Sequence, residues 1–307
     1  MKTLFEFKTL TDFTDYFCDD ATCVKHFTES RFRDGEYCPH CQHDKIYLCA
    51  NGKRYQCASC KQDFTIKTNT IFGESKLPLR KWYMAVYLLS TSNKGISSVQ
   101  LAKQVGVTQK TAWFMAHRIR AAKTQSSQKL SGTVEADETF IGGKEKNKHA
   151  SNRKHIGTGG AGKIPIFGMK SREGEVRAQV IENVRATELQ PVIQESVAAG
   201  SNVYTDSWCG YNGLKNYLHT VVNHSCGVYV DGIAHTNGIE SFWALFKRGY
   251  HGIYHHMSKK HLQRYVNEFT FRVNRRTMTM QNIFSELVVN AAETAQLPYK
   301  SLIQKTA

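Results

Sequence analysis

The sequence contains no long uninterrupted apolar segment. None of its runs approaches the about 18 apolar residues that would indicate a membrane-spanning helix. The opening segment, Met1–Leu10, mixes charged residues with phenylalanine and lacks the apolar core of a secretion signal. We therefore expect a cytoplasmic protein with no membrane partner. In that reducing compartment the nine cysteines are expected to be thiols or metal ligands rather than disulfides.

Acidic residues are missing from Ser75–Val134, a stretch that holds ten lysines and arginines. A second basic stretch, Ser241–Met280, holds eight lysines and arginines and the single acid Glu268. Across the 307 residues, 41 Lys and Arg stand against 26 Asp and Glu, a formal net charge of +15. This balance indicates a polyanionic partner, nucleic acid before an anionic membrane surface.

Internal repeats are absent as well, and from about residue 131 the pattern becomes one of alternating strands and helices. A helix is expected to open at Thr187 with Gln190 as its capping-box partner, and to end at Gly200. This alternation predicts an α/β domain. The expected strands are Thr133–Ile141, Lys163–Met169, Glu175–Ile181, Asn202–Thr205 and Tyr217–Asn223.

Four cysteines form two CxxC pairs, Cys38-Pro-His-Cys41 and Cys57-Ala-Ser-Cys60, with fifteen residues between them. Two intervening residues let both thiolates of a tight turn face one ion, and two such turns complete a tetrahedral site. Because four thiolates leave no position open for water, the predicted Zn²⁺ is structural. The alternative is four unrelated thiols. The nearby His40, His43 and Cys49 are surplus to a four-ligand site.

Residues Ile96–Ala122 have the pattern of a helix-turn-helix. Ala102 is small enough for two helices to approach, and Gly106 can adopt the turn conformation that other residues resist. Thr108 can cap the second helix, whose early residues would then face a DNA major groove. A plain helical hairpin is the alternative. The candidate DNA-binding residues on the second helix are Gln109, Lys110, Thr111 and Arg118.

Three acids are candidates for a catalytic cluster. Asp137 and Asp206 each close a predicted strand, although an aspartate at that place can also be a turn or N-cap residue. Glu240 precedes Lys247 by seven residues, so a carboxylate and a cation would share one helix face. A carboxylate beside a cation suits a metal site that opens onto a phosphate backbone.

Clustered carboxylates suit the chemistry of phosphodiester cleavage, which requires an activated water and a stabilised leaving oxygen. Two divalent ions about 4 Å apart supply both, and hard cations prefer carboxylate oxygens. Without a cation such a cluster is electrostatically costly, which makes it a poor structural device. The ligand set indicates Mg²⁺, with Mn²⁺ as its usual substitute.

Three motifs carry a resemblance to a known family. They are Asp137-Glu138-Thr139-Phe140-Ile141-Gly142-Gly143-Lys144, Thr205-Asp206-Ser207-Trp208-x-x-Tyr211 and His235-Thr236-Asn237-x-x-Glu240-Ser241-x-Trp243-x-x-x-Lys247-Arg248-Gly249. With the cysteine pairs upstream, they resemble insertion-sequence transposases that have an N-terminal zinc ribbon and a DDE-type, integrase-like domain. The resemblance runs from Cys38 to near Arg276. It implies a ribonuclease H-like mixed-sheet fold, binding to terminal inverted repeats, and metal-dependent DNA cleavage and strand transfer.

By that resemblance Asp137, Asp206 and Glu240 are the catalytic, metal-binding triad, and Lys247 with the adjacent Arg248 contacts DNA. Some relatives are described with asparagine at the third position, which leaves Asn237 as an alternative to Glu240. Glu240 also has a purely structural interpretation. With Asn237 as the N-cap, Glu240 would be the third residue of a capping box.

The expected organisation follows from these motifs. It comprises an N-terminal helical segment (1–37), a zinc ribbon (38–74), a helix-turn-helix domain (75–130), the catalytic domain (131–290) and a tail (291–307). The expected partners are double-stranded DNA, as element ends and target, and a second copy of the chain in a homodimer or larger assembly. Two alternatives remain open, a nuclease of the ribonuclease H class and a DNA-binding regulator without activity.

Overall fold

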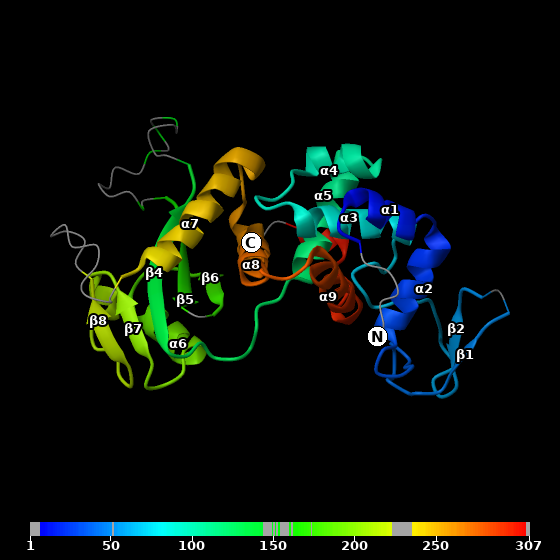
Figure 1. Ribbon diagram of the computed structural model, residues 1–307, viewed down its shortest axis with the longest axis horizontal. Helices are drawn as coiled ribbons and strands as arrows, with labels where there is room; N and C mark the ends of the chain where they lie inside the picture. The colour runs from blue at the N-terminus through cyan, green and yellow to red at the C-terminus, as the bar shows by residue number, and fades with distance from the viewer. Residues whose placement is uncertain are drawn as a thin grey trace. The chain divides into compact units, whose positions relative to one another are not determined.

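The chain forms two compact units, which Figure 1 colours from blue at the N-terminus to red at the C-terminus. The computed structural model describes residues 7–50, 52–143, 149, 151, 153, 160, 162–172, 174–222 and 235–304. The first unit comprises Met1–Lys123 together with Thr277–Ala307, and the second comprises Thr124–Arg276. Within the described ranges, no helix is long and apolar enough to cross a membrane.

The first unit is mainly helical and is built from both ends of the sequence. Its α9, from the C-terminal end, contacts α2 and α3, and the ring centroid of Phe284 lies 5.2 Å from that of Phe13 and 5.3 Å from that of Tyr83. The segment around α9, which we expected to end the catalytic domain, thus completes an aromatic core in the first unit. The helices outside the helix-turn-helix are α1 (Leu10–Tyr16), α2 (Asp20–Arg31), α3 (Leu79–Thr91), α9 (Met280–Glu293) and α10 (Tyr299–Ile303).

The predicted helix-turn-helix pattern corresponds to α4 (Ser98–Val105) and α5 (Gln109–Ala121). The Thr108 side chain accepts a hydrogen bond from the backbone N–H of Thr111, which caps α5 as expected. Gly106 ends α4 in the left-handed conformation, with φ of 68° and ψ of 54°. A residue with a Cβ atom adopts that conformation only at a cost, so the glycine sets the turn between the helices.

A small antiparallel sheet lies between α2 and α3 in the sequence. Its strands are β1 (Ile46–Leu48), β2 (Tyr55–Cys57) and β3 (Asp63–Phe64), in the order β1-β2-β3. Cys38, Cys57 and Phe64 are its fully buried apolar residues. A core of this size buries little surface, so the sheet needs a further source of stability such as a bound metal ion.

The second unit contains a five-stranded mixed sheet in the order β6-β5-β4-β7-β8. Strands β4, β5 and β6 are antiparallel neighbours, whereas β7 and β8 run parallel to β4. This mixed α/β architecture confirms the expected fold class. The strands are β4 (Thr133–Ile141), β5 (Ile164–Ser171), β6 (Val176–Val180), β7 (Asn202–Thr205) and β8 (Leu218–Val221).

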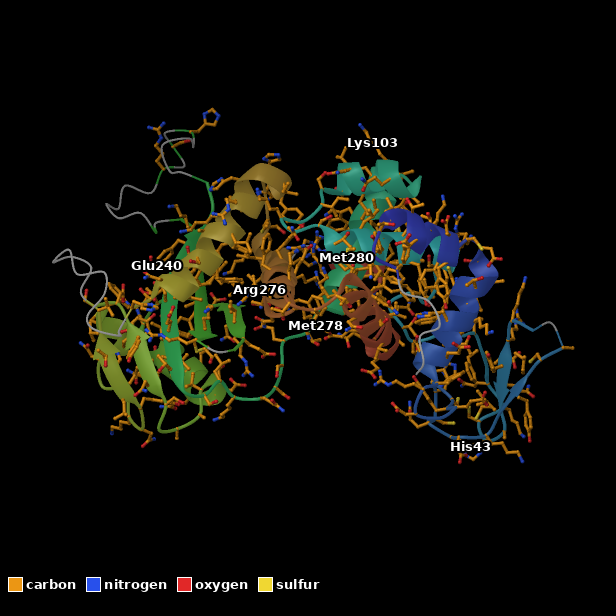
Figure 2. All side chains as sticks on the ribbon, in the orientation of Figure 1. His43, Lys103, Glu240, Arg276, Met278 and Met280 are labelled. Atoms are coloured by element: carbon orange, nitrogen blue, oxygen red, sulfur yellow. The ribbon has the colours of Figure 1, made fainter. Side chains whose placement is uncertain are left out.

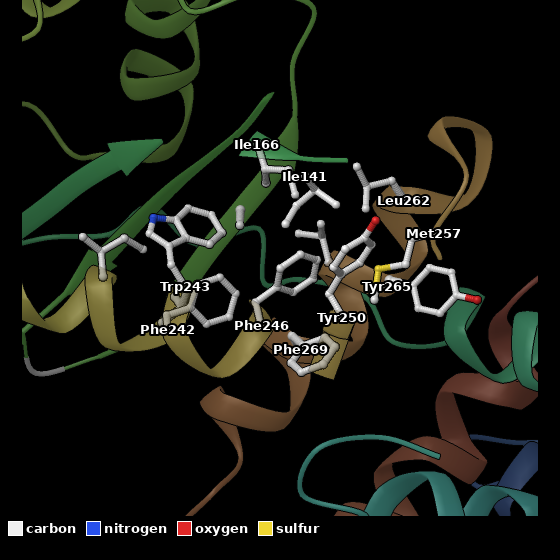
Figure 3. Packing of buried hydrophobic residues seen from close by; sticks show 14 residues of the cluster. Ile141, Ile166, Phe242, Trp243, Phe246, Tyr250, Met257, Leu262, Tyr265 and Phe269 are labelled. Carbon is white, nitrogen blue, oxygen red and sulfur yellow. The ribbon is translucent and has the colours of Figure 1, made fainter. Parts of the chain in front are cut away.

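Helices cover both faces of this sheet. One face packs against α6 (Ala186–Ser196), whose Leu189 and Ile193 share a core with Phe167 and Met169 of β5. The other face packs against α7 (Asn237–Gly249) and α8 (Lys259–Asn274), which are separated by the π-helical turn η5 (Tyr250–Tyr254). Figure 3 shows the aromatic residues of α7 and α8 packed beneath the strands. Since side chains alternate along a strand, each sheet residue faces either α6 or the pair α7 and α8.

Candidate active site and zinc site

The four paired cysteines come together at one point of the zinc-ribbon segment. Their sulfur atoms all lie within 4.8 Å of one another, with Cys38 Sγ 3.7 Å from Cys60 Sγ and Cys41 Sγ 3.5 Å from Cys57 Sγ. A tetrahedral zinc site with Zn–S bonds of about 2.3 Å requires sulfurs roughly 3.8 Å apart. The cysteines are therefore positioned to bind one Zn²⁺, as the sequence predicted.

The two cysteine turns have the same backbone design. In each turn, the amide two residues after the first cysteine donates to its sulfur, from His40 to Cys38 and from Ser59 to Cys57, both at 3.4 Å. These N–H donors would stabilise the negative thiolates of a metal-bound state. His43 is partly exposed on this segment (Figure 2). Among the described residues, the cysteine cluster does not include His40, His43 or Cys49.

Asp137 and Asp206 lie on adjacent parallel strands of the second unit. The register pairs Glu135 of β4 with Tyr204 of β7, and its continuation by two residues places Asp206 beside Asp137. Asp206 Oδ1 accepts a hydrogen bond of 3.0 Å from the backbone N–H of Trp208. Parallel pairing thus brings together two acids that are far apart in the sequence.

The segment after β7 is held by several side chains. The Trp208 indole N–H donates to the carbonyl of Val184 at 2.7 Å, and Gln190 donates to the carbonyl of Asn212 at 2.9 Å. The capping box expected for Thr187 and Gln190 does not form, because α6 begins at Ala186 without a side-chain cap. Gln190 instead supports the 3-10 turn η3 (Cys209–Tyr211) that follows Asp206.

Glu240 lies in the first turn of α7, which crosses β4 and β5 (Figures 1 and 2). Its Oε1 accepts a 2.8 Å hydrogen bond from the Thr236 hydroxyl. Thr236 rather than Asn237 is the N-cap, so the capping box that we considered for Glu240 does not form. Asn237 is the first helical residue and is exposed, as are Glu240 and Lys247.

The three acids share one electrostatic field. Burial raises the pKa of Asp137 to about 7, and the charges of Asp206 and Glu240 act in the same direction. The backbone N–H of Glu138 and the ammonium of Lys247 act against this rise in the pKa. A carboxyl group that ionises with such difficulty gains most from a bound cation, which would remove the repulsion.

Sequence reasoning missed Glu135, which fixes the beginning of α7. Its side chain is buried, and Oε2 accepts a 3.0 Å hydrogen bond from the backbone N–H of Ile239. His235 Nδ1 lies 3.2 Å and Arg172 Nε 3.6 Å from Oε1. A carboxylate at this place offsets the positive end of the helix dipole and locates the turn that carries Glu240. The sequence signal that could have identified Glu135 is its position two residues before Asp137, which places both side chains on the same face of β4.

Gly168 allows α7 to approach the sheet beside Asp137. The two residues are paired in register on β5 and β4. A Cβ atom on Gly168 would lie 2.5 Å from the indole ring of Trp243, which packs among Ile141, Ile166 and the other core residues shown in Figure 3. The glycine therefore makes room for the aromatic side chain that seats α7 near the acids.

A further carboxyl group, Glu138, was quoted in the first motif without a role. It faces the α6 side of the sheet, and its Oε2 accepts a short hydrogen bond from the Tyr211 hydroxyl. Burial raises the pKa of Glu138 to about 7, and the Tyr211 hydrogen bond acts against the rise while Asp206 and Asp137 add to it. Glu138 and Tyr211 thus join β4 to the segment that carries Asp206.

The candidate DNA-binding residues of α5 occupy its N-terminal turn. Gln109 and Lys110 are exposed, and Thr111 is half-buried. Gln109 Nε2 donates to Ser98 Oγ at 2.8 Å, which joins the two helices of the motif. The Lys110 ammonium lies 5.1 Å from the ring centroid of Tyr299. This exposed polar turn is the part of the helix that is accessible to a DNA groove.

Arg118, which was also expected to contact DNA, lies in a different environment. It is only 2% exposed, and its guanidinium donates to the carbonyl groups of Leu297, Ile71 and Gly73. Burial lowers the pKa of this group, and Glu74 partly offsets the effect. These contacts join α5 to segments from both ends of the sequence, so the geometry gives Arg118 a structural role instead of a DNA contact. Arg248, the candidate DNA contact on α7, is exposed next to Lys247 at the end of that helix.

Comparison with known proteins agrees with this geometry. Residues 129–274 match the family described as the ISXO2-like transposase domain, and residues 18–63 match the transposase zinc-ribbon domain. A protein of Halobacterium salinarum, described as an uncharacterized protein in transposable element ISH50, is 29% identical over 83% of this chain and 91% of its own. An uncharacterized transposase-like protein of Haemophilus influenzae is 32% identical over 37% of this chain and 94% of its own.

Among solved structures, the chain is similar to a chain from the cryo-electron microscopy structure of the simian T-cell lymphotropic virus intasome in complex with PP2A regulatory subunit B56 gamma. The match covers 61% of this chain and 65% of that one, with a TM-score of 0.29 and 13% identity. A likeness this low supports no conclusion about the present chain. The two family matches and the Haemophilus relative do support a conclusion. The chain belongs to the insertion-sequence transposases that combine an N-terminal zinc ribbon with an ISXO2-like, DDE-type domain.

Proposed function

We propose that the chain is an active DNA transposase that binds the terminal inverted repeats of its element, cleaves DNA there and transfers the cut strand to a target. The observation that carries the proposal is that the charges of Asp206 and Glu240 both raise the pKa of the buried Asp137 carboxyl group. Three carboxylates held in one field are unfavourable for a folded protein without a cation. Their arrangement suits a divalent metal site on the α7 side of the sheet.

The chemistry proposed for this site is two in-line displacements at phosphorus. Asp137, Asp206 and Glu240 would hold Mg²⁺ or Mn²⁺, and the bound ions would activate the attacking hydroxyl and stabilise the leaving oxygen. Lys247 shares a face of α7 with Glu240 and would bind a phosphate next to the scissile bond. Water would attack first and expose a 3′-hydroxyl, which then attacks the target strand.

DNA recognition is assigned to the helix-turn-helix. Gln109 and Lys110 lie at the exposed start of α5, where a recognition helix contacts base edges. With a net charge of +15, the chain should also bind DNA of any sequence, with an affinity that falls steeply as salt rises. Handling two element ends at once would require at least a homodimer.

The decisive experiment measures excision and strand transfer of a marked DNA segment bounded by the native flanking repeats, in Mg²⁺. It compares the intact chain, Asp206→Asn, and the control Asp15→Asn, which removes an exposed aspartate from α1. Joined products should form with the intact chain and the control, and disappear with Asp206→Asn. Cleavage without joining would indicate a nuclease. Specific repeat binding with neither reaction would indicate a regulator, and either result would refute the proposal.

A further inference from the structure

A cavity with a mixed polar and apolar lining lies along β6, at the edge of the sheet in the second unit. Its volume is about 670 Å³, which is within the range of about 300–1,000 Å³ typical of small-molecule sites. Arg177 of β6 lines this cavity together with side chains from α6, α8 and the segment before β4. The cavity is separate from the carboxylate cluster. Arg177 is paired with Met169 and faces α6, whereas Asp137 is on β4 and faces α7.

Side-chain amides form a fixed wall of the cavity. Gln125 donates to the carbonyl of Ala178 at 2.8 Å and accepts from its N–H at 3.1 Å, so it pairs with the edge strand like a peptide group. Gln263 accepts from the N–H of Val180 at 2.7 Å. Both amides also donate to Asn267 Oδ1, at 2.9 and 2.8 Å. These bonds fix the orientation of Asn267 and direct its NH₂ group away from them.

Arg177 has a buried and uncompensated guanidinium. The residue is 8% exposed, and its Nε and Nη2 atoms are buried without a hydrogen-bond partner among the described residues. Burial lowers the pKa of the group, and only Glu175 acts against this. Within the described ranges, the Asn267 side chain accepts these two hydrogen bonds at Oδ1 and its NH₂ group has no acceptor. A buried cation is retained at a cost in stability unless an anion neutralises it.

We propose that this cavity is an anion-binding site in which Arg177 and Asn267 bind a phosphate group. The planar guanidinium presents donors that match phosphate oxygens, and the amide supplies a neutral donor on a fixed wall. Two sources offer this chemistry, the backbone of a DNA strand and a free phosphate or mononucleotide. The site requires no catalysis by the carboxylate cluster, so it goes beyond the proposed function and can be tested without it.

Glu195 is an acidic residue of the cavity lining. It is exposed on α6 and lines the same cavity. Among the described residues, no ion pair joins it to Arg177, whose Nε and Nη2 have no hydrogen-bond partner. If phosphate is the natural partner, then removal of the Glu195 charge should strengthen phosphate binding, because a like charge leaves the cavity.

The test measures the melting temperature of the full chain in increasing potassium phosphate, thymidine monophosphate or single-stranded oligothymidine, against potassium chloride of equal ionic strength. The variants are Arg177→Leu, Glu195→Gln and the control Lys215→Gln. Lys215 is an exposed cation just before β8, the strand at the opposite edge of the sheet from β6. The intact chain and the control should show saturable stabilisation by phosphate. Arg177→Leu should require at least tenfold more, and Glu195→Gln several-fold less.

The three probes identify the source of the phosphate. Stabilisation by phosphate and the mononucleotide, lost in Arg177→Leu, would indicate a small ligand. An Arg177-dependent response to the oligothymidine alone would indicate a DNA strand, since binding elsewhere on the chain is unaffected by the substitution. Equal responses of the intact chain and Arg177→Leu to every probe would overturn the proposal.

A second measurement avoids reliance on the variant's folding. Phenylglyoxal labelling of the intact chain, read by peptide mass spectrometry, should modify Arg177 slowly and should be blocked there by phosphate. The exposed Arg276 should remain reactive under the same conditions. Labelling of Arg177 that phosphate does not slow would refute the assignment, whatever the melting temperatures show.

Discussion

The zinc ribbon and the carboxylate cluster are two candidate metal sites constructed in opposite ways. The four thiols lie between Cys38 and Cys60, on two turns with the same backbone hydrogen bonds. The three candidate acids are spread from Asp137 to Glu240, on a strand, after its parallel neighbour and on a helix that covers the sheet. A closed thiolate site can form locally, whereas a site built from the three acids would depend on the whole fold of the second unit.

The first prediction concerns the local site and has the largest expected effect. Cys57→Ser should abolish stoichiometric zinc and unfold the segment from β1 to β3, because its apolar core is very small. Binding of structural zinc contributes about 10–16 kcal/mol in isolated zinc-finger peptides. Zinc content by elemental mass spectrometry and limited proteolysis would measure both effects. Cys49→Ser is the matched control, since Cys49 lies outside the cluster, and it should retain zinc. Full zinc content in Cys57→Ser would contradict the four-cysteine site.

The second prediction decides which residue is the third ligand of the open site. Glu240→Gln keeps the side-chain volume and the Thr236 contact but loses the charge, so strand transfer should fall by more than about 100-fold, beyond the loss expected for an outer-shell residue. Asn237→Ala should keep most of the activity. The opposite pattern, with activity lost only in Asn237→Ala, would transfer the role to Asn237. Zinc content should not change in either variant, which separates the two metal sites.

The third prediction uses the raised pKa of Asp137. Its pKa is 3.8 in an unperturbed chain and about 7 in the fold, so the folded state holds the proton more tightly. This contribution to stability is complete below pH 3.8, is lost as the pH rises towards 7, and stays lost above that. Metal-free Asp137→Asn should therefore exceed the intact chain in urea midpoint by an amount that grows from pH 5 to pH 8.

Divalent ions should reverse this difference. At pH 8, Mg²⁺ at about 100 times its dissociation constant should stabilise the intact chain by about 2.7 kcal/mol. Asp137→Asn should respond much less. A midpoint difference that is independent of pH, or an equal Mg²⁺ response in both chains, would show that Asp137 is not part of a cation site. The zinc ribbon should contribute nothing to this pH dependence when zinc is saturating.

The smallest effect is expected at the contact between β4 and the segment after β7. Tyr211→Phe removes the hydroxyl that donates to Glu138 and leaves that carboxyl group without this donor. We expect a loss of about 1–3 kcal/mol in stability and a modest loss of strand transfer. Tyr217→Phe, which removes a hydroxyl bonded to the carbonyl of Val197 at 3.2 Å, is the control. It should affect stability without selectively affecting transfer. Equal transfer losses in both would refute a positioning role for Tyr211.

The sequence predicted best where the signal was local. The CxxC pairs specified the cysteine cluster, and the observed bounds of β4 and β7 are those expected, Thr133–Ile141 and Asn202–Thr205. Each strand begins with residues that pack into the core and leads to an aspartate, Asp137 in the middle of β4 and Asp206 directly after β7. The capping glycine of the helix-turn-helix was identified for the same reason, since one residue type satisfies one backbone conformation.

Prediction failed where distant residues compete for a hydrogen bond. Gln190 was expected to cap its own helix, but the carbonyl of Asn212 accepts from it instead. Glu135 appeared to be an ordinary strand residue, although α7 supplies the N–H group that it binds. The basic residue Arg118 was interpreted as a DNA contact because charge in a sequence does not reveal which carbonyls surround it.

The construction of the first unit from both ends of the chain has a consequence for its synthesis. A ribosome delivers domains from the N-terminus onward, and most fold in that order. Here α9, with Phe284 in the aromatic core of the first unit, is translated after the whole of the second unit. The second unit can therefore fold while the unit with the helix-turn-helix still lacks a core helix. A message truncated after Arg276 would yield a complete second unit and a first unit that lacks α9.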